Sequence, residues 1–471
     1  MSKKIPLNRN QVWVFPPTLD ECVDARDSVR FVWDFVGELD LGALGLVEDP
    51  SKDGRPHFAP EMLLCVWLLG WMERIHSPRR LERACRRDVG YMWLTGFTRP
   101  DHTTLWRFFA KNKALFVSLF KKIVRVAAHS GLVGMALHAI DGTKIQAASS
   151  TDTAYHKTRL EEALKKLDEA VKTGVEQIES AEKDVEEYNG ALPVQMANQE
   201  ERKQKIRQAL EALKDAKTNH LHPAEADARM MKGRQNTRMG YNAQAVADHD
   251  SDLIVAQDVF NDQNDLALAE TMLDVTKEIL GDIAKANVLD AGYASGQQID
   301  ALQKRHLPIY APFAGDSSSN EGFPKAEFHF DAERDVYVCP MGKELRLLRV
   351  EAAGKTKPYP RRVYGCSELE CSAKGQCTKS KTGRTVKRSP YDDARERQIE
   401  LQKAPEVKIL MSLRKEIIEH AFGAIKAIQG FTRFTARGMK SAKAQWALVC
   451  SAYNLKKLHR MTLAGATLQF S

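Results

Sequence analysis

Two aspartates stand at the ends of short apolar runs, where their carboxylates could bind a metal ion. Asp141 follows "LHAI" and precedes Gly142, and Asp290 follows "NVL". Such runs predict strands that stop at a turn, and neighbouring strand ends in a mixed sheet meet at one edge. Two close carboxylates repel unless a cation lies between them, and Mg²⁺ is commonly held by one or two protein carboxylates. The pair predicts a magnesium site, although each Asp alone is more typical of a turn residue.

A later stretch with a helical pattern offers a third carboxylate. Residues 414–431, "RKEIIEHAFGAIKAIQGF", carry Glu416 and Glu419 among cations. Glu419 and Lys426 are seven residues apart, two turns along one helix face, whereas the seventh position after Glu416 is Gly423. A third carboxylate would complete a two-metal site, which activates water or a 3′ hydroxyl and stabilises the leaving oxygen. The stretch could equally be a solvated helix surface, so the pattern alone leaves both glutamates open.

Four of the eight cysteines, Cys339, Cys366, Cys371 and Cys377, fall within 39 residues. A four-thiolate zinc site commonly uses tighter Cys pairs than these, but a small, loop-rich basic module needs a staple. Structural zinc and free thiols therefore remain alternatives. With zinc bound, we expect the surrounding cations to contact nucleic acid backbone: Arg361, Arg362, Arg384, Lys387 and Arg388.

Positive charge is concentrated in one window. The chain has a net charge of +8, and residues 76–125 hold twelve Lys and Arg against three acids. This favours a polyanion partner, nucleic acid above all, and the alternative is a basic solvated helix face. The sequence contains neither an apolar run long enough for a membrane helix nor a signal peptide. We expect a cytoplasmic, nucleoid-associated bacterial protein without disulfides.

The elements that must position these residues predict a mixed α/β fold. Residues 15–130 look helical, with Ser77 as a helix cap before Pro78 and Asp101 as another, separated by a turn at Gly96. This is the outline of a helix-turn-helix, which many helical bundles share. Next come a strand, an inserted helical hairpin, two strands, a helix, a strand, a helix and a strand. The hairpin is broken by "YNGALP" at 188–193, and "GDSSSNEGF" at 315–323 is a linker.

Turn and cap residues complete this scheme. We interpret Asp248 and Asp262 as turn residues, Asn264 or Asp265 as the cap of a helix, and Gly281 as the end of that helix. The predicted units are a helical DNA-binding domain (1–130), two parts of a catalytic core (131–157 and 223–314), the hairpin (158–222), a cysteine-rich insertion (315–402) and C-terminal helices (403–471).

Four motifs in order carry a resemblance to a known family. "AIDGTKI", "GYNAQAV", "VLDAGY" and "EHAFGAIK" resemble the bacterial insertion-sequence transposases that use a DDE triad on a ribonuclease H-like core. "PEMLLCVWLLG" and "PDHTTLWRF" are similar to that family's helical N-terminal domain, and "AYNLKKL" to its closing helix. The resemblance extends from about residue 55 to 458.

The resemblance implies Asp141, Asp290 and Glu419 as the triad, holding two Mg²⁺ ions for which Mn²⁺ can substitute. It favours Glu419 because family members carry a Lys seven residues after their Glu. Asp141 and Asp290 are 149 residues apart, and Asp290 and Glu419 are 129 residues apart. Each of these intervals contains one predicted insertion. The chain departs from the family pattern at two positions before the glutamate. Ser412 stands in place of a Tyr, and Lys415 in place of an Arg, with Arg414 adjacent.

The resemblance also implies a function and partners. We expect a DNA transposase that cleaves element ends and transfers the 3′ hydroxyl into target DNA; a metal-dependent nuclease and a catalytically silent DNA-binding derivative are the alternatives. The partners would be double-stranded DNA, both terminal inverted repeats and target, and a second copy of the chain in a dimer or higher assembly. Tyr293 is expected near the metals. The expected DNA-binding residues are Lys426, Arg414, Lys415, Lys144, Arg79, Arg80, Arg83, Arg86, Arg87 and Arg107.

Overall fold

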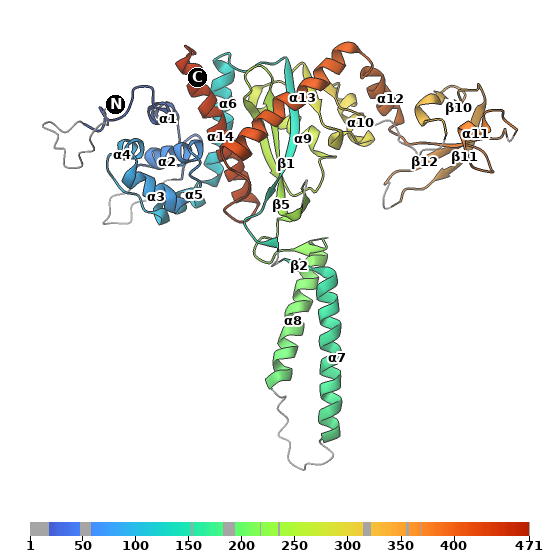
Figure 1. Ribbon diagram of the computed structural model, residues 1–471, viewed down its shortest axis with the longest axis horizontal. Helices are drawn as coiled ribbons and strands as arrows, with labels where there is room; N and C mark the ends of the chain where they lie inside the picture. The colour runs from blue at the N-terminus through green and yellow to red at the C-terminus, as the bar shows by residue number, and fades with distance from the viewer. Residues whose placement is uncertain are drawn as a thin grey trace, which may run out of the picture.

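The computed structural model describes residues 18–47, 58–151, 154–181, 194–216, 218–233, 236–313, 322–354, 358–368 and 370–470. A central sheet lies between the N-terminal helices and a small β module, and a long helical hairpin projects away from it (Figure 1). The predicted hairpin turn at 188–193 and most of the predicted linker, 315–321, lie outside the described residues.

The N-terminal region is helical, as the sequence predicts. Asp101 caps its helix by accepting a hydrogen bond from the Thr104 amide at 2.6 Å, and Pro78 begins another. Ser77 occupies the cap position before Pro78 but makes no side-chain cap bond. Gly96, with φ of +54°, turns the chain between two helices. The helices are α1 (Ser28–Gly37), α2 (Pro60–Met72), α3 (Pro78–Arg87), α4 (Val89–Leu94), α5 (His102–Lys111) and α6 (Lys113–His129).

Six strands among the described residues form the central sheet: β1 (Leu137–Gln146), β4 (Arg229–Lys232), β5 (Thr237–Asp248), β6 (Ile254–Phe260), β7 (Ala286–Leu289) and β8 (Ile309–Tyr310). β5 pairs antiparallel with β1, β4 and β6. On the other side of β1, β7 and then β8 run parallel to it. The predicted order of strands and helices is confirmed, with β4 as an addition.

Asp141 lies inside β1, so the prediction that the strand stops there is wrong. β1 stays paired with β5 through Gln146, and Thr143 and Ile145 beyond Asp141 are buried. The Asp-Gly pair suggests a turn, but burial of alternate side chains and a long partner strand carry the backbone straight through.

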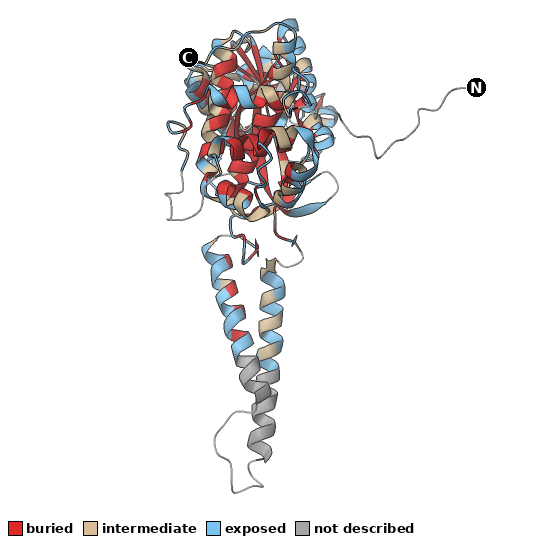
Figure 2. Ribbon diagram, turned by 90° about the vertical axis from the view of Figure 1, so that its left-hand side faces the viewer, coloured by how far each residue is buried: buried red, intermediate tan, exposed pale blue. Residues whose placement is uncertain are grey.

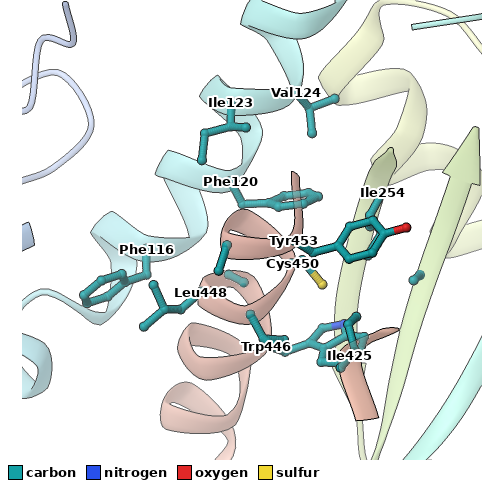
Figure 3. Close-up of a cluster of buried hydrophobic side chains, with 14 of the residues drawn as sticks. Phe116, Phe120, Ile123, Val124, Ile254, Ile425, Trp446, Leu448, Cys450 and Tyr453 are labelled. Atoms are coloured by element: carbon teal, nitrogen blue, oxygen red, sulfur yellow. The ribbon is translucent and has the colours of Figure 1, made fainter. Parts of the chain in front are cut away.

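Helices cover the sheet and connect it to the N-terminal region. These are α9 (Leu268–Leu280), α10 (Gly296–Lys304), α13 (Pro405–Gly423) and α14 (Met439–Leu463). α13 packs on β1, β5 and β7, while α14 packs on β6 and α6. Figure 3 shows buried side chains of α6, β6 and α14 interlocked, among them Phe120, Ile254 and Trp446. The Trp446 indole also donates to the Gln244 carbonyl at 2.9 Å. No helix of the described chain is long and apolar enough to cross a bilayer.

The hairpin consists of α7 (Lys157–Ala181) and α8 (Val194–Asp215), which pack against each other. A two-stranded ribbon, β2 (Tyr155–His156) with β3 (His220–Leu221), lies at its base. Figure 2 shows that its described residues are mostly exposed or half-buried, in contrast to the buried body beside the sheet. The two helices lie between the first two long strands in the chain, where the sequence predicts an inserted hairpin.

The cysteine-rich segment forms a separate antiparallel sheet in the order β13-β12-β11-β10-β9. Its elements are β9 (His329–Asp331), β10 (Val336–Val338), β11 (Glu344–Glu351), β12 (Arg361–Cys366), α11 (Lys374–Cys377) and β13 (Thr385–Arg388). Five buried residues, Phe328, Tyr337, Leu345, Tyr364 and Val386, form a core distinct from the main one. The helix α12 (Asp392–Leu401), which packs on α10, leads back to the main body.

Candidate active site

The two aspartates of the predicted metal site lie side by side. β1 and β7 are parallel, with Ile140 opposite Leu289, so the next residues, Asp141 and Asp290, are neighbours. A single guanidinium spans both carboxylates. Arg414 Nη1 lies 3.0 Å from Asp141 Oδ2, and Nη2 lies 3.4 Å from Asp290 Oδ1. The sheet register thus brings together two residues that are far apart in the sequence, and a cation lies between them.

Asp141 is the more buried carboxylate of the pair. Its side chain is 20% exposed, whereas that of Asp290 is 47% exposed. Burial raises the pKa of Asp141 from 3.8 to about 6, and nearby Asp290 and Asp265 raise it too; the Gly142 amide and Arg414 act in the opposite direction. A desolvated carboxylate with acidic neighbours gains more from a divalent cation than an exposed one does.

The helix α13 presents Arg414, rather than a glutamate, to the aspartate pair. Arg414 lies on the face that packs on the sheet, with buried Ile417 and Ile418. Glu419 is five residues further, which is about 140° round a helix and about 7.5 Å along it, and it is exposed. Glu416 is also exposed, and within the described residues neither glutamate makes an ion pair. The structure brings Asp141 and Asp290 together but not Glu419, whose role stays a prediction.

The helix register between Glu419 and Lys426 differs from the one expected. α13 ends at Gly423 and continues as a π-helical turn, Ala424–Ile428, that contains Lys426. The two-turn spacing assumed an unbroken α-helix, so the face shared by the two residues is shifted by the wider turn. The helical segment stops before Gly430, which has φ of +70°. Lys415 and Lys426 are both exposed.

Asp265 is a site residue that the sequence analysis missed. It was one of two expected caps for α9, yet the cap position is Ala267 and has no side-chain bond. Asp265 Oδ1 instead accepts hydrogen bonds from Lys144 Nζ at 2.9 Å, Asn242 Nδ2 at 2.7 Å and Gln244 Nε2 at 2.8 Å. The only local signal was the acidic run "NDQND" directly after a strand.

This network lies behind the aspartate pair. Gly142 and Lys144 share the face of β1 opposite that of Asp141, and a Cβ on Gly142 would lie 2.9 Å from Asp265 Oδ1. Tyr293 is buried and donates its hydroxyl to Gln244. Burial, Asp265 and Asp141 all raise the pKa of Tyr293. Tyr293 is therefore a buried structural neighbour of the site.

Asp248 and Asp262 behave as the sequence predicts. Asp248 ends β5, and its Oδ2 accepts hydrogen bonds from both the amide and the hydroxyl of Ser251 in the following turn. Asp262 is exposed in the loop after β6.

The predicted nucleic-acid contacts of the N-terminal region are on the surface. α3 buries Leu81 and Cys85, and its arginines face solvent; Arg86 pairs with Glu82 at 2.6 Å. The exposed arginines are Arg79, Arg80, Arg83, Arg86 and Arg87 on α3 and Arg107 on α5. An exposed arginine-rich helix of this kind suits a phosphate backbone.

The cations around the cysteines are mostly engaged within the module. Arg361 and Lys387 pair with Glu351, and Arg362 pairs with Asp335. Arg384 donates to the Phe323 carbonyl at 2.9 Å. The expectation of DNA contact is wrong for Arg388, which is buried among Asp393, Glu396 and the Phe330 ring. Strand pairing places Glu351 opposite Arg361, whereas Arg388 meets Asp393 and Glu396 of the segment that directly follows it.

The aspartate pair fits a divalent cation in part. Asp141 and Asp290 supply oxygen ligands of the kind that Mg²⁺ takes. In the structure, the positive charge between these two carboxylates is that of Arg414. Across the described residues, no group of three or more His, Cys, Asp or Glu side chains is arranged to hold a metal ion. Asp141 and Asp290 would therefore hold the ion with waters and substrate oxygens as the remaining ligands.

Carboxylates paired at the centre of a mixed sheet, together with an exposed arginine-rich helix in the N-terminal region, suit an enzyme that acts on nucleic acid. Comparison with protein families agrees. Residues 338–459 match the family described as Transposase DDE domain, and residues 18–111 match Transposase domain (DUF772). Both matches are to transposase families, and together they support a DDE-class insertion-sequence transposase; transposases act on DNA.

The DDE match includes the four clustered cysteines and α13, with Glu419, but neither Asp141 nor Asp290. The comparisons with curated proteins and with solved structures give no match.

Proposed function

We propose that this transposase cleaves DNA at the ends of its element and joins the freed 3′ hydroxyls to target DNA in a divalent-metal-dependent reaction. One observation carries the proposal: Asp141 and Asp290 are neighbours across β1 and β7, with the Arg414 guanidinium between them. Two partly buried carboxylates that share one cation have the charge and the oxygen atoms that an Mg²⁺ or Mn²⁺ site requires.

The sheet topology supports a ribonuclease H-like core. Its three long strands, β1, β5 and β6, form an antiparallel meander, and β7 and β8 continue the sheet parallel to β1 on the other side. Asp141 on the first strand and Asp290 after the fourth strand of this order then occupy adjacent positions at the centre. The helical hairpin and the cysteine module interrupt the core between elements of this pattern.

Asp141, Asp290 and Glu419 would hold the metal ions. Bound Mg²⁺ would supply activation of water or a 3′ hydroxyl and stabilisation of the leaving oxygen. Before metal binding, Arg414 holds the two aspartates together and neutralises part of their charge. Because α13 carries Glu419 away from the pair in this structure, Glu419 joins them only if α13 shifts or turns when DNA binds. Such a movement would also free the Arg414 guanidinium for a DNA phosphate.

The surrounding cations would position the DNA. Exposed Lys415 and Lys426 would contact phosphates near the cleaved bond. Lys144 lies on the other face of β1 and pairs with Asp265, so it would reach a phosphate only if that ion pair opened. The arginines of α3 and Arg107 would bind the terminal inverted repeats. Because two element ends must be brought together, we expect a dimer or a higher assembly.

A strand-transfer assay with pre-cleaved element ends tests this function. The wild-type protein is expected to join such ends to target DNA in Mg²⁺ or Mn²⁺, and Asp290→Asn is expected to bind the same DNA without cleaving or joining it. Hydrolysis without joining would identify a nuclease, and binding alone would identify a silent derivative. Unchanged cleavage by the Asp290→Asn variant would contradict the site assignment.

A further inference from the structure

The four clustered cysteines surround one small cavity in the β module. Cys339 follows β10, Cys366 ends β12, Cys371 precedes α11 and Cys377 ends it. All four are free thiols of intermediate burial, and all four line the same cavity of about 30 Å³. Since about 10–15 Å³ is enough for one water molecule, this space suits a single small ion.

The turn after β10 points its backbone at the first sulfur. The Cys339 amide donates to the Lys343 carbonyl at 2.9 Å, and the Gly342 amide donates to the Cys339 carbonyl at 2.8 Å. Gly342 has φ of +74°, a conformation that glycine adopts at little cost. The turn lets the Lys343 amide donate to Cys339 Sγ at 3.3 Å. A sulfur accepts such a bond best as a thiolate, since ionised acceptors make the stronger hydrogen bonds.

Two further glycines allow the chain to close around the other sulfurs. Gly383 has φ of +96°, and a Cβ on it would lie 2.5 Å from the Cys366 carbonyl oxygen. Gly322 has φ of +115°, and its Cβ would lie 2.0 Å from the carbonyl oxygen of Cys377. Backbone approaches this close leave no room for a side chain. These two glycines therefore allow the chain to pass directly against the backbone of Cys366 and of Cys377.

Charge in the cavity favours a cation. Four thiolates in one cavity repel one another, and the three cations that also line it, Lys343, Lys374 and Arg384, do not balance four such charges. A divalent ion bound to all four sulfurs removes this repulsion, because coordination deprotonates a thiol outright.

We propose that this cavity is a structural zinc site with Cys339, Cys366, Cys371 and Cys377 as ligands. Soft thiolates select Zn²⁺ among the common divalent ions, and four of them leave no open position for catalysis. The ion would fasten the loop between β12 and β13 to the β10–β11 turn. Among the described residues of the module, the separate hydrophobic cluster has five buried members, and a bound metal ion would add stability to so small a core.

The sulfurs are not yet arranged as metal ligands, since the described residues contain no such group. Binding would draw the four side chains inward by rotation about χ1, which moves a cysteine sulfur between staggered positions without moving the backbone. The backbone of the loops that contain Cys366 and Cys377 would keep its position.

Metal content of the full-length protein tests the proposal. We expect about one zinc per chain in the wild-type protein and in Cys22→Ser, a control at an exposed cysteine outside the module. In Cys366→Ser and Cys371→Ser, zinc affinity is expected to fall at least tenfold. Replacement of zinc by Co²⁺ is expected to give the absorption of a tetrahedral thiolate complex in the wild type only.

Asp290→Asn is expected to keep the zinc, so this result is independent of the proposed transposition activity. The proposal is overturned if the wild-type protein takes up no zinc from a zinc-buffered solution, if all four thiols react equally with and without zinc, or if they are found as disulfides.

Discussion

Arg414 on α13 and Asp141 on β1, 273 residues apart in the sequence, form an ion pair of 3.0 Å at the centre of the site. The same guanidinium reaches Asp290. The pair joins α13 to the strand that carries the first proposed catalytic residue. The position of α13 and the charge state of the site are therefore coupled.

Removing this cation is expected to destabilise the metal-free protein. Arg414→Ala leaves two neighbouring carboxylates uncompensated, which we expect to lower the free energy of unfolding by about 2 kcal/mol. Addition of Mg²⁺ should raise the stability of the variant more than that of the wild type, because the ion replaces the missing charge. Urea unfolding with and without Mg²⁺ measures both effects. An equal Mg²⁺ effect on the two proteins would show that Arg414 and the metal do not share a site.

The raised pKa of Asp141 predicts a pH dependence with a definite sign. Its folded-state pKa of about 6 exceeds the ordinary 3.8, so the folded protein binds this proton more tightly than the unfolded chain does. In the absence of metal, its contribution to stability is therefore greatest below about pH 4, falls as the pH rises to about 6, and is constant above. Unfolding in chelator at several pH values should show this slope in the wild type and not in Asp141→Asn.

Metal affinity should follow the opposite trend. Binding requires the Asp141 carboxylate, so the affinity for Mn²⁺ or Mg²⁺ is expected to rise as the pH increases through about 6 and then level off. Titration calorimetry at pH 5 and pH 7.5 measures it. An affinity that does not change between these values would exclude Asp141 as a ligand.

Two exposed glutamates on α13 provide a matched pair of variants. Glu419→Gln and Glu416→Gln are each expected to change the free energy of unfolding by no more than about 0.5 kcal/mol, since both side chains face solvent. Only Glu419→Gln is expected to reduce the rate of cleavage at element ends, by at least about 100-fold. The reverse outcome would assign the third carboxylate to Glu416, and full activity in both would mean that α13 supplies none.

Asp265 is expected to stabilise the network behind the site. Asp265→Asn replaces an acceptor of three hydrogen bonds, one of them from Lys144, with a group that accepts less strongly. We expect a loss of about 1–3 kcal/mol in the free energy of unfolding. Asp262→Asn, in the same loop but exposed, is the control and should change little. Equal effects of the two substitutions on the free energy of unfolding would show that the hydrogen bonds of Asp265 add no stability.

The arginines of α3 are expected to bind DNA phosphate. The double variant Arg79→Ala, Arg83→Ala should reduce affinity for all DNA sequences about equally, and the slope of log affinity against log salt should become shallower by about 2. Lys304→Ala, on the exposed surface of α10, is the control. Fluorescence anisotropy at several salt concentrations gives the slope, and an unchanged slope would place the DNA elsewhere.

Local patterns in the sequence determined most elements and the residue types of the site. The cap at Asp101, the start at Pro78 and the end of α9 at Gly281 depend on chemistry within one helical turn, and the structure confirms them. The order of strands and helices followed from apolar runs and their spacing. Asp141 and Asp290 could be paired in advance because adjacent parallel strands bring equivalent positions together.

Tertiary structure decided which side chains actually meet. Asp265 does not cap α9, because its carboxylate instead accepts hydrogen bonds from Lys144, Asn242 and Gln244 of the sheet. Arg414, and not Lys415, faces the aspartates because the packed face of α13 is fixed by its contacts with β1, β5 and β7. Register and packing between segments hundreds of residues apart set these partners. No local pattern encodes such contacts, because each depends on the energy of the whole arrangement.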